Sequence, residues 1–235
     1  MTDARVALVT GARKGIGLEI ARFLVARGYR VIGCSREAAG WSDENYEHHR
    51  LDVADEGAVR ALAVAIRRKH GGLDVAVNNA GIASMNAFFL VPTATVERVM
   101  RTNFLGTWIV SREAAKLMRS RGRGRIVNLS SVAVPLNLEG EAAYIASKSA
   151  VEALTKSLSF ELGTLGITVN AIGPTPILTD LLRGVPQDKI RALVDRQAVK
   201  RLGEPRDVLN VLDFLIRPES DFVTGQVIYL GGVGA

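Results

Sequence analysis

The chain has 235 residues, with 30 basic and 24 acidic side chains and a formal net charge of +6. Hydrophobic residues make up 48% of it, which excludes disorder as the main state, and the single cysteine, Cys34, excludes an internal disulfide framework and a thiolate zinc site. The excess of positive charge leaves a nucleic-acid or polyphosphate partner open.

The sequence shows no targeting or membrane signal. The apolar run at residues 6–9 is too short for the core of a signal peptide, and no window approaches the ~18 uninterrupted apolar residues of a membrane helix. The three histidines are too few and too loosely placed for a metal site. We therefore expect a cytoplasmic protein with no metal and no membrane contact.

Short apolar runs alternate with longer amphipathic segments along the chain. In chain order the pattern predicts a strand at residues 6–10, a helix at 15–27, strands at 30–34 and 49–52, a helix at 55–69, a strand at 73–78, a helix at 95–120, a strand at 125–130, a helix at 142–165, a strand at 167–172, a helix at 206–216 and a strand at 226–230. Repeated βαβ units of this kind form a parallel sheet covered by helices on both faces. We expect a single doubly wound (Rossmann-like) α/β domain over residues 1–235, with about seven strands.

One segment interrupts this alternation. Residues 173–186 contain three prolines and one internal glycine and are too short to separate two domains. Long connections in compact domains tend to be functional, so we interpret the segment as the start of a substrate lid at about residues 175–203. The alternative is an ordinary surface loop with a short helix.

A glycine-rich loop, Thr10-Gly11-Ala12-Arg13-Lys14-Gly15-Ile16-Gly17, follows the first predicted strand directly. Its glycines permit a tight turn and let a pyrophosphate approach the backbone. The helix that opens at Gly15 offers free N–H groups and the positive end of its dipole. The loop therefore predicts a dinucleotide site, although glycines that only tighten a strand-to-helix turn would look the same.

The spacing Gly-x-x-x-Gly-x-Gly with a leading threonine resembles the short-chain dehydrogenase/reductase family. Further markers of that family follow in order: Asn78-Asn79-Ala80-Gly81, Asn103, Ser130-Ser131, Tyr144-x-x-x-Lys148, Asn170-Ala171-Ile172-Gly173-Pro174, Arg201-Leu202-Gly203-Glu204-Pro205 and Thr224-Gly225-Gln226. They span nearly the whole chain. The resemblance implies an oxidoreductase that transfers hydride between a nicotinamide and a carbonyl or secondary alcohol.

Tyr144 and Lys148 lie four residues apart on a predicted helix and therefore share a face. A free tyrosine has a pKa near ~10, and an ammonium one turn away favours the phenolate, so we expect Lys148 to lower the pKa of Tyr144. Tyr144 would then exchange a proton with the substrate oxygen, which Ser131 would hold by a hydrogen bond. By resemblance, Lys148 also contacts the nicotinamide ribose, and Asn103 holds a water that links Lys148 to solvent.

The second predicted strand ends Cys34-Ser35-Arg36, without the carboxylate that NAD-preferring enzymes present there. Arg36, with Lys14 and Arg13 in the glycine loop, can pair with a 2′-phosphate, which favours NADP(H). Asp52 and Val53 resemble the family's adenine contact, but Asp52 could equally cap the next helix. The cofactor-binding residues that we expect are Gly11, Arg13, Lys14, Gly15, Ile16, Gly17, Ser35, Arg36, Asp52, Val53, Asn79, Ala80, Gly81, Tyr144, Lys148, Pro174, Ile177 and Thr179.

The substrate is less well defined by the sequence. Val134, Leu136 and Leu138 are the candidate pocket walls, and a small-molecule ketone reductase is the leading interpretation. A 3-oxoacyl-thioester (acyl-carrier-protein) reductase is the alternative, with residues 119–125 and their four arginines either docking an acidic carrier near the cleft or forming a solvated turn. A non-catalytic nicotinamide-binding regulator is a third class, and we expect no nucleic-acid partner because no recognition motif appears. By resemblance, the protein is a homotetramer or homodimer.

Overall fold

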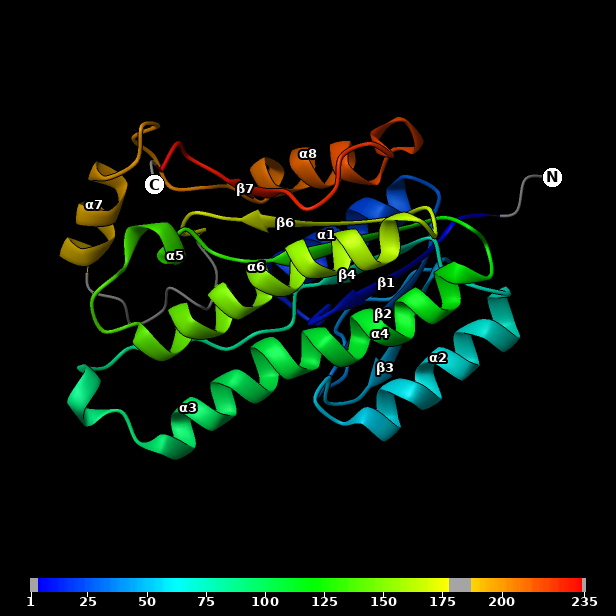
Figure 1. Ribbon diagram of the computed structural model, residues 1–235, viewed down its shortest axis with the longest axis horizontal. Helices are drawn as coiled ribbons and strands as arrows, with labels where there is room; N and C mark the ends of the chain where they lie inside the picture. The colour runs from blue at the N-terminus through cyan, green and yellow to red at the C-terminus, as the bar shows by residue number, and fades with distance from the viewer. Residues whose placement is uncertain (1–3, 178–186, 234–235) are drawn as a thin grey trace.

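Seven parallel strands form one sheet in the middle of the computed structural model, which describes residues 4–177 and 187–233 (Figure 1). The strands are β1 (Val6–Thr10), β2 (Arg30–Ser35), β3 (Tyr46–Arg50), β4 (Val75–Asn78), β5 (Gly124–Leu129), β6 (Ile167–Gly173) and β7 (Val227–Tyr229). Their order across the sheet is β3-β2-β1-β4-β5-β6-β7. This order confirms the predicted doubly wound α/β domain.

Helices cover both faces of this sheet. The helical elements are α1 (Gly15–Ala26), α2 (Glu56–His70), η1 (Phe88–Leu90), α3 (Thr93–Met100), η2 (Arg101–Leu105), α4 (Gly106–Arg119), α5 (Ala133–Leu136), α6 (Ala142–Gly163), α7 (Gln187–Asp195), α8 (Pro205–Ile216) and η4 (Pro218–Ser220). Helices α1 and α8 pack together on one face, whereas α2, α4 and α6 cover the other (Figure 1).

The alternation of side chains along each strand divides the apolar core in two. On β1, Leu8 joins the core beneath α2 and α4, while its neighbours Ala7 and Val9 join the core beneath α1 and α8. Both faces of the central strands are therefore buried, which explains why these strands read as continuous apolar runs in the sequence.

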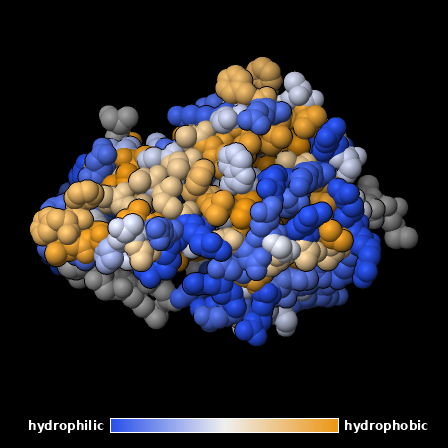
Figure 2. Space-filling model, turned by 60° about the horizontal axis from the view of Figure 1, so that its bottom comes forward, coloured by the Kyte–Doolittle hydropathy of each residue, from blue (hydrophilic) through white to orange (hydrophobic). Residues whose placement is uncertain are grey.

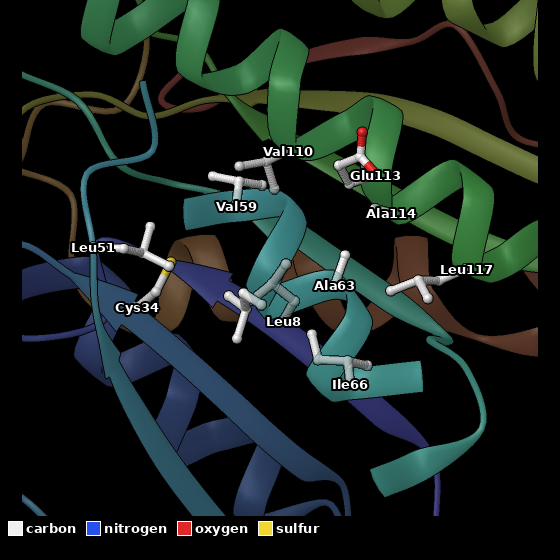
Figure 3. A pocket seen from close by; sticks show the side chains of 11 residues that line it. Leu8, Cys34, Leu51, Val59, Ala63, Ile66, Val110, Glu113, Ala114 and Leu117 are labelled. Carbon is white, nitrogen blue, oxygen red and sulfur yellow. The ribbon is translucent and has the colours of Figure 1, made fainter. Parts of the chain in front are cut away.

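Figure 3 shows how closely the first of these cores is packed. Side chains of β1, β2, α2 and α4 meet around a small apolar space, with Cys34 beside Leu51. Burial raises the pKa of the Cys34 thiol to about 12. Cys34 is therefore a small, unreactive core residue.

The edge strand β3 differs most from the sequence prediction. It spans Tyr46–Arg50 instead of residues 49–52, and pairs Val31 with Tyr46 and Ser35 with Arg50. Its side chains are half-buried and polar because one side of the strand has no neighbour in the sheet, so no apolar run marks it. The following helix, α2, is capped by Asp55, which accepts a hydrogen bond from the Ala58 N–H at 3.0 Å.

The long helix predicted at residues 95–120 is present but irregular. It consists of α3, a π-helical turn (η2, Arg101–Leu105) and α4. Such turns insert an extra residue into the helical ladder and are frequent at functional sites. The turn contains the buried residue Asn103, whose side chain bonds Ile82, after β4, and Ser147 on α6.

No helix within the described ranges 4–177 and 187–233 is long and apolar enough to cross a membrane.

The arginines of residues 119–125 do not flank the cleft, which corrects the docking position suggested above. They precede and begin β5, whereas Ser131 follows its other end, and a six-residue strand is roughly 20 Å long. Arg121 instead pairs with the buried Asp74 at 2.7 Å, and the buried Arg125 donates to the carbonyl oxygen of Pro218 at 3.1 Å. Two of these arginines therefore stabilise the fold.

This pairing leads to a prediction about stability. Asp74→Asn should lower the free energy of unfolding by about 1–3 kcal/mol, because the substitution removes the charge that a partly buried guanidinium faces. Arg123→Ala is the control: its side chain is 69% exposed and lies 3.5 Å from Asp74, so the loss should be about 0–1 kcal/mol. Urea unfolding followed by circular dichroism measures both, and equal losses would contradict the assignment.

Candidate active site

A cleft of about 640 Å³ opens at the carboxyl ends of the central strands. It extends from Ile16, at the start of α1, to residues 129–133 after β5 and to α6 and α7. In parallel α/β sheets, ligands bind in this crevice where the strand order reverses, here between β1 and β4. The cleft is therefore the candidate site.

The glycine loop forms one end of the cleft and has the backbone that the sequence predicts. Gly11 and Gly15 have φ angles of +67° and +58°, a region that L side chains rarely adopt. At Gly17 a Cβ atom would lie 2.3 Å from the Gly11 carbonyl oxygen and 2.4 Å from the Asn79 amide nitrogen. The loop is thus folded tightly against the neighbouring strand, and the N-terminus of α1 stays accessible, as a pyrophosphate site requires.

Thr10 and Asn79 hold this loop to the end of β4. The Thr10 hydroxyl oxygen accepts hydrogen bonds from the backbone N–H groups of Asn79 and Ala80, both at 3.0 Å. The Asn79 amide in turn donates to the carbonyl oxygens of Thr10 and Gly11. Asn79 and Gly81 also line the cleft, so this expected cofactor segment both supports and borders the site.

The end of β2 carries the residues expected to select the cofactor. Arg36 is exposed and has no ion-pair partner among the described residues. The Ser35 hydroxyl donates to the Glu37 carbonyl oxygen at 2.6 Å and contacts a ring nitrogen of His48 at 2.8 Å. Arg13, in contrast, forms an ion pair of 3.1 Å with Glu37, so part of its charge is already compensated.

Asp52 and Val53 lie after β3, on the same edge of the sheet. Asp52 accepts a hydrogen bond from the Ala54 N–H at 2.9 Å, and the α2 cap is Asp55, so Asp52 is not the helix cap. Val53 is buried against Gly106, where a Cβ atom would come within 2.5 Å of a Val53 methyl group.

Asn103 is fixed in place on every side. Its amide donates to the Ile82 carbonyl oxygen and to the Ser147 hydroxyl, each at 2.9 Å, and its side-chain oxygen accepts from the Ile82 N–H at 2.8 Å. A Cβ atom on Gly81 would lie 3.3 Å from Asn103 Oδ1 and 3.5 Å from Lys148 Nζ. Asn103 and Lys148 therefore converge on the same side of Gly81.

Tyr144 and Ser131 face each other in the cleft. Burial raises the pKa of Tyr144 to about 12, Glu141 raises it further, and a hydrogen bond with Ser131 lowers it. The prediction that Lys148 lowers the pKa of Tyr144 is therefore wrong for the protein without ligand, because burial raises this pKa and Lys148 is not among the groups that shift it. The ammonium lies 5.8 Å from the centre of the phenol ring and donates to the Leu129 carbonyl oxygen at 2.7 Å instead.

Lys148 is 5% exposed, and burial lowers its pKa to about 8, while the charge of Glu152 raises it. Tyr144 in its protonated form and a titratable ammonium thus lie together in one cleft. Two groups whose pKa values are shifted by burial are typical of acid–base sites.

The segment after β6 closes the far end of the cleft. Pro174 and Ile177 line it, and Ile177 forms an isolated bridge with Gly203. Thr179 and the rest of residues 178–186 of the expected lid lie outside the described residues. The later part of the lid contains α7, whose Ile190 and Leu193 line the cleft.

The expected pocket walls are correct in part. Leu138 lines the cleft, whereas Leu136 and Val134 are not among its lining residues. Leu136 packs with Val132 and Val233 in an apolar cluster beside the cleft. Sequence reasoning missed the buried Glu152 on α6, although its spacing of four residues from Lys148 was visible.

Comparison with known proteins gives consistent matches. A family model described as enoyl-(acyl carrier protein) reductase matches residues 11–233. The 3-oxoacyl-[acyl-carrier-protein] reductase of Vibrio cholerae is 33% identical over 236 residues, which cover 98% of this chain and 97% of that protein. The enzyme of the same name from Escherichia coli is 31% identical over the same shares of the two chains.

Two solved structures with different named activities are equally similar. The ligand-free aldohexose dehydrogenase of Thermoplasma acidophilum has a TM-score of 0.89 and 32% identity, covering 98% of this chain and 94% of that one. A putative gluconate dehydrogenase from Agrobacterium tumefaciens has a TM-score of 0.88 and 31% identity, covering 97% and 94%.

The packing of the glycine loop gives a testable prediction. Gly17→Ala should weaken adenine dinucleotide binding at least about tenfold, because the new methyl group forces the loop away from Gly11 and Asn79. Gly163→Ala is the control: Gly163 lies at the end of α6, and no atom lies within 4 Å of the position of an added Cβ atom. This variant should bind the dinucleotide as tightly as the wild type does. Fluorescence titration with a reduced dinucleotide measures both constants, and unchanged binding in Gly17→Ala would contradict the role of the loop.

Proposed function

We propose that this chain, which belongs to the short-chain dehydrogenase/reductase family and is an oxidoreductase of carbonyl and alcohol groups, reduces a small-molecule ketone with NADP(H) as its preferred cofactor. The observation that carries this proposal is the convergence of Ser131, Tyr144 and Lys148 in one cleft that begins at the glycine loop.

A bound nicotinamide would supply hydride to the carbonyl carbon in reduction, or accept it from the alcohol carbon in oxidation. The glycine loop and the start of α1 would hold its pyrophosphate, and Lys148 the ribose beside the nicotinamide. Pro174 and Ile177, at the far end of the cleft, would border the nicotinamide. The accessible helix N-terminus and the absence of a Cβ at Gly17 fit such a ligand.

The chain's own residues handle the proton. Tyr144 donates its phenolic proton to the carbonyl oxygen as the alcohol forms, and Ser131 holds that oxygen by a hydrogen bond. Because the pKa of Tyr144 is raised to about 12, the phenol is protonated at neutral pH, which is the form that reduction needs. The Lys148 ammonium stabilises the phenolate that remains, and Asn103 keeps the wall of the cleft beside Lys148 in position.

The preference for NADP(H) rests on the end of β2. No acidic residue lies between Arg30 and Arg36, so nothing there repels a 2′-phosphate or bonds both ribose hydroxyls of NAD. The exposed Arg36 and Lys14 supply positive charge, and Ser35 supplies a hydroxyl. Arg13 contributes less, since Glu37 already faces it.

A 3-oxoacyl-thioester reductase is the second candidate, and the similarity to the carrier-protein reductases favours it. The cleft itself favours a free ketone. Among the described lining residues at its surface, Glu139 and Glu141 are acidic and Arg196 is basic, so this rim does not attract an acidic carrier. The arginines of residues 119–125 lie at the opposite edge of the sheet.

The substrate class is tested by the loss of absorbance at 340 nm with NADPH and a panel of carbonyl compounds. We expect turnover with α-dicarbonyls, ketoses or quinones to exceed that with β-ketoacyl thioesters, both free and on a carrier protein. The reverse order would favour the second candidate, and no turnover with any carbonyl would favour a non-catalytic nicotinamide-binding regulator.

We further propose that the protein is a homotetramer or homodimer. Large apolar side chains are exposed on neighbouring helices, among them Leu105, Trp108 on α4 and Phe160 on α6, the last of which is 85% exposed. Figure 2 shows apolar surface gathered over one part of the face on which α3 and α4 lie, while the rest of that face is mostly hydrophilic. A second subunit would cover such a surface.

Removing the proton donor tests the catalytic assignment. Tyr144→Phe should lower kcat by about 10²–10⁴-fold with a smaller change in KM, because the phenylalanine ring fills the same space without the hydroxyl. Tyr29→Phe, a buried tyrosine at the opposite edge of the sheet, should leave kcat unchanged. Steady-state kinetics with the best ketone decides, and turnover close to wild type in Tyr144→Phe would refute the assignment.

Reversing the charge at the end of β2 tests the cofactor preference. Arg36→Asp should weaken NADPH binding by about 10–100-fold and leave NADH binding equal or tighter, since a charge-assisted bond to the 2′-phosphate is lost. Arg30→Asp, at the other end of the same strand, is the matched control and should change neither constant. If wild type binds NADPH no more tightly than NADH, the preference is wrong.

A further inference from the structure

A buried carboxylate lies one helical turn from the proposed catalytic lysine. Glu152 follows Lys148 by four residues and Tyr144 by eight on α6, so the three side chains form one stripe of the helix. Glu152 is 8% exposed and Lys148 5%. A carboxyl group at such a depth is costly unless it is bonded or paired.

Two hydroxyl groups bind this carboxylate from different strands. Ser130, at the end of β5, donates to one oxygen of Glu152, and Tyr229 of β7 donates to the other at 2.8 Å. Both oxygens accept, and neither donates, which is the pattern of an ionised carboxylate. Both oxygens of the buried carboxylate are thus bonded by hydroxyl donors.

Tyr229 is held in a fixed position to make this bond. It is paired with Gly173 across β6 and β7, and a Cβ atom on Gly173 would lie 2.4 Å from the Tyr229 ring. Burial, followed by the bond and the charge of Glu152, raises the pKa of Tyr229 well above its ordinary value. Tyr229 therefore keeps its proton at neutral pH and donates it to the hydrogen bond with Glu152.

Apart from Glu152, the groups that face Lys148 are neutral. They are the Leu129 carbonyl oxygen from β5, the Asn103 amide from η2 and the Tyr144 phenol from α6 itself. The Glu152 carboxylate is the charged group that acts on Lys148 within the described residues, and it opposes the lowering of the lysine pKa by burial. Without it, the ammonium would have no counter-charge.

We propose that Glu152 is a positioning residue of the active site: anchored by Ser130 and Tyr229, its carboxylate keeps the buried Lys148 charged. The inference rests on the proposed catalytic role of Tyr144 and Lys148. It also links β7, which makes no contact with the reacting atoms, to the state of the lysine. Glu152 itself acts only through Lys148.

Glu152→Gln tests this inference, because the amide has the same shape and can still bond Ser130 and Tyr229. The alkaline limb of the pH profile of kcat/KM for ketone reduction should move to lower pH by about one unit or more. At a pH above the alkaline limbs of both the wild type and the variant, kcat/KM of the variant should be about tenfold lower than that of the wild type. On the plateau below these limbs, the difference in kcat/KM should be much smaller. An alkaline limb of Glu152→Gln at the same pH as in the wild type would overturn the proposal.

The lysine can also be titrated directly in the protein without cofactor. NMR of ¹³C-labelled lysine, with the signal assigned by Lys148→Met, should give a lower pKa for Lys148 in Glu152→Gln than in wild type. Glu113→Gln on α4 is the matched control: Glu113 is 6% exposed and pairs with Lys116 and Arg112, and its substitution should leave the Lys148 titration unchanged. If Glu152→Gln does not fold, Glu152→Met replaces it in the same titration.

The outcomes separate this proposal from the proposed function. An unchanged Lys148 pKa in a folded Glu152 variant, together with an inactive Tyr144→Phe, overturns the role of Glu152 alone. An active Tyr144→Phe overturns the catalytic assignment, whatever the lysine titration shows.

Discussion

The side chains of the proposed reaction meet at one edge of the sheet, where the carboxyl ends of all seven parallel strands lie. The carboxyl ends of parallel strands meet at that edge, and the reversal of order between β1 and β4 separates the helices there into two sets. The glycine loop after β1, Gly81 after β4 and Ser131 after β5 are thereby brought to one cleft from distant parts of the sequence. The same constraint sends the arginines of residues 119–125 to the opposite edge.

Several buried polar groups at this edge have hydrogen-bond partners in the protein. Asn103 makes three hydrogen bonds to Ile82 and Ser147, and the Asn79 amide binds two carbonyl oxygens of the glycine loop. A buried amide without such bonds would cost about 1–3 kcal/mol. These contacts fix the walls of the cleft before any ligand enters, which reduces the ordering that binding requires.

The central strands could be predicted from the sequence because both of their faces are buried, as the alternation of Leu8 and Val9 between the two cores shows. The glycine loop and the Tyr144–Lys148 pair were also predictable, since their spacing is itself the signal. The edge strand β3 was not, because its polar side chains leave no apolar run. The π turn around Asn103 was not either, because an inserted residue does not change the amphipathic pattern enough to be seen.

Burial acts on the two groups of the site in opposite directions and makes both less charged. It raises the pKa of Tyr144 to about 12 and lowers that of Lys148 to about 8. A neutral phenol suits the donor in reduction, whereas a neutral amine would not stabilise the phenolate that reduction leaves. The site therefore needs two opposing effects. Burial of Tyr144 keeps its phenol protonated, whereas a negative charge near Lys148 must keep the ammonium protonated. On α6, Tyr144 lies one turn before Lys148 and Glu152 one turn after it. Glu152 is bonded to Ser130 and Tyr229, and a carboxylate there opposes the effect of burial on the lysine.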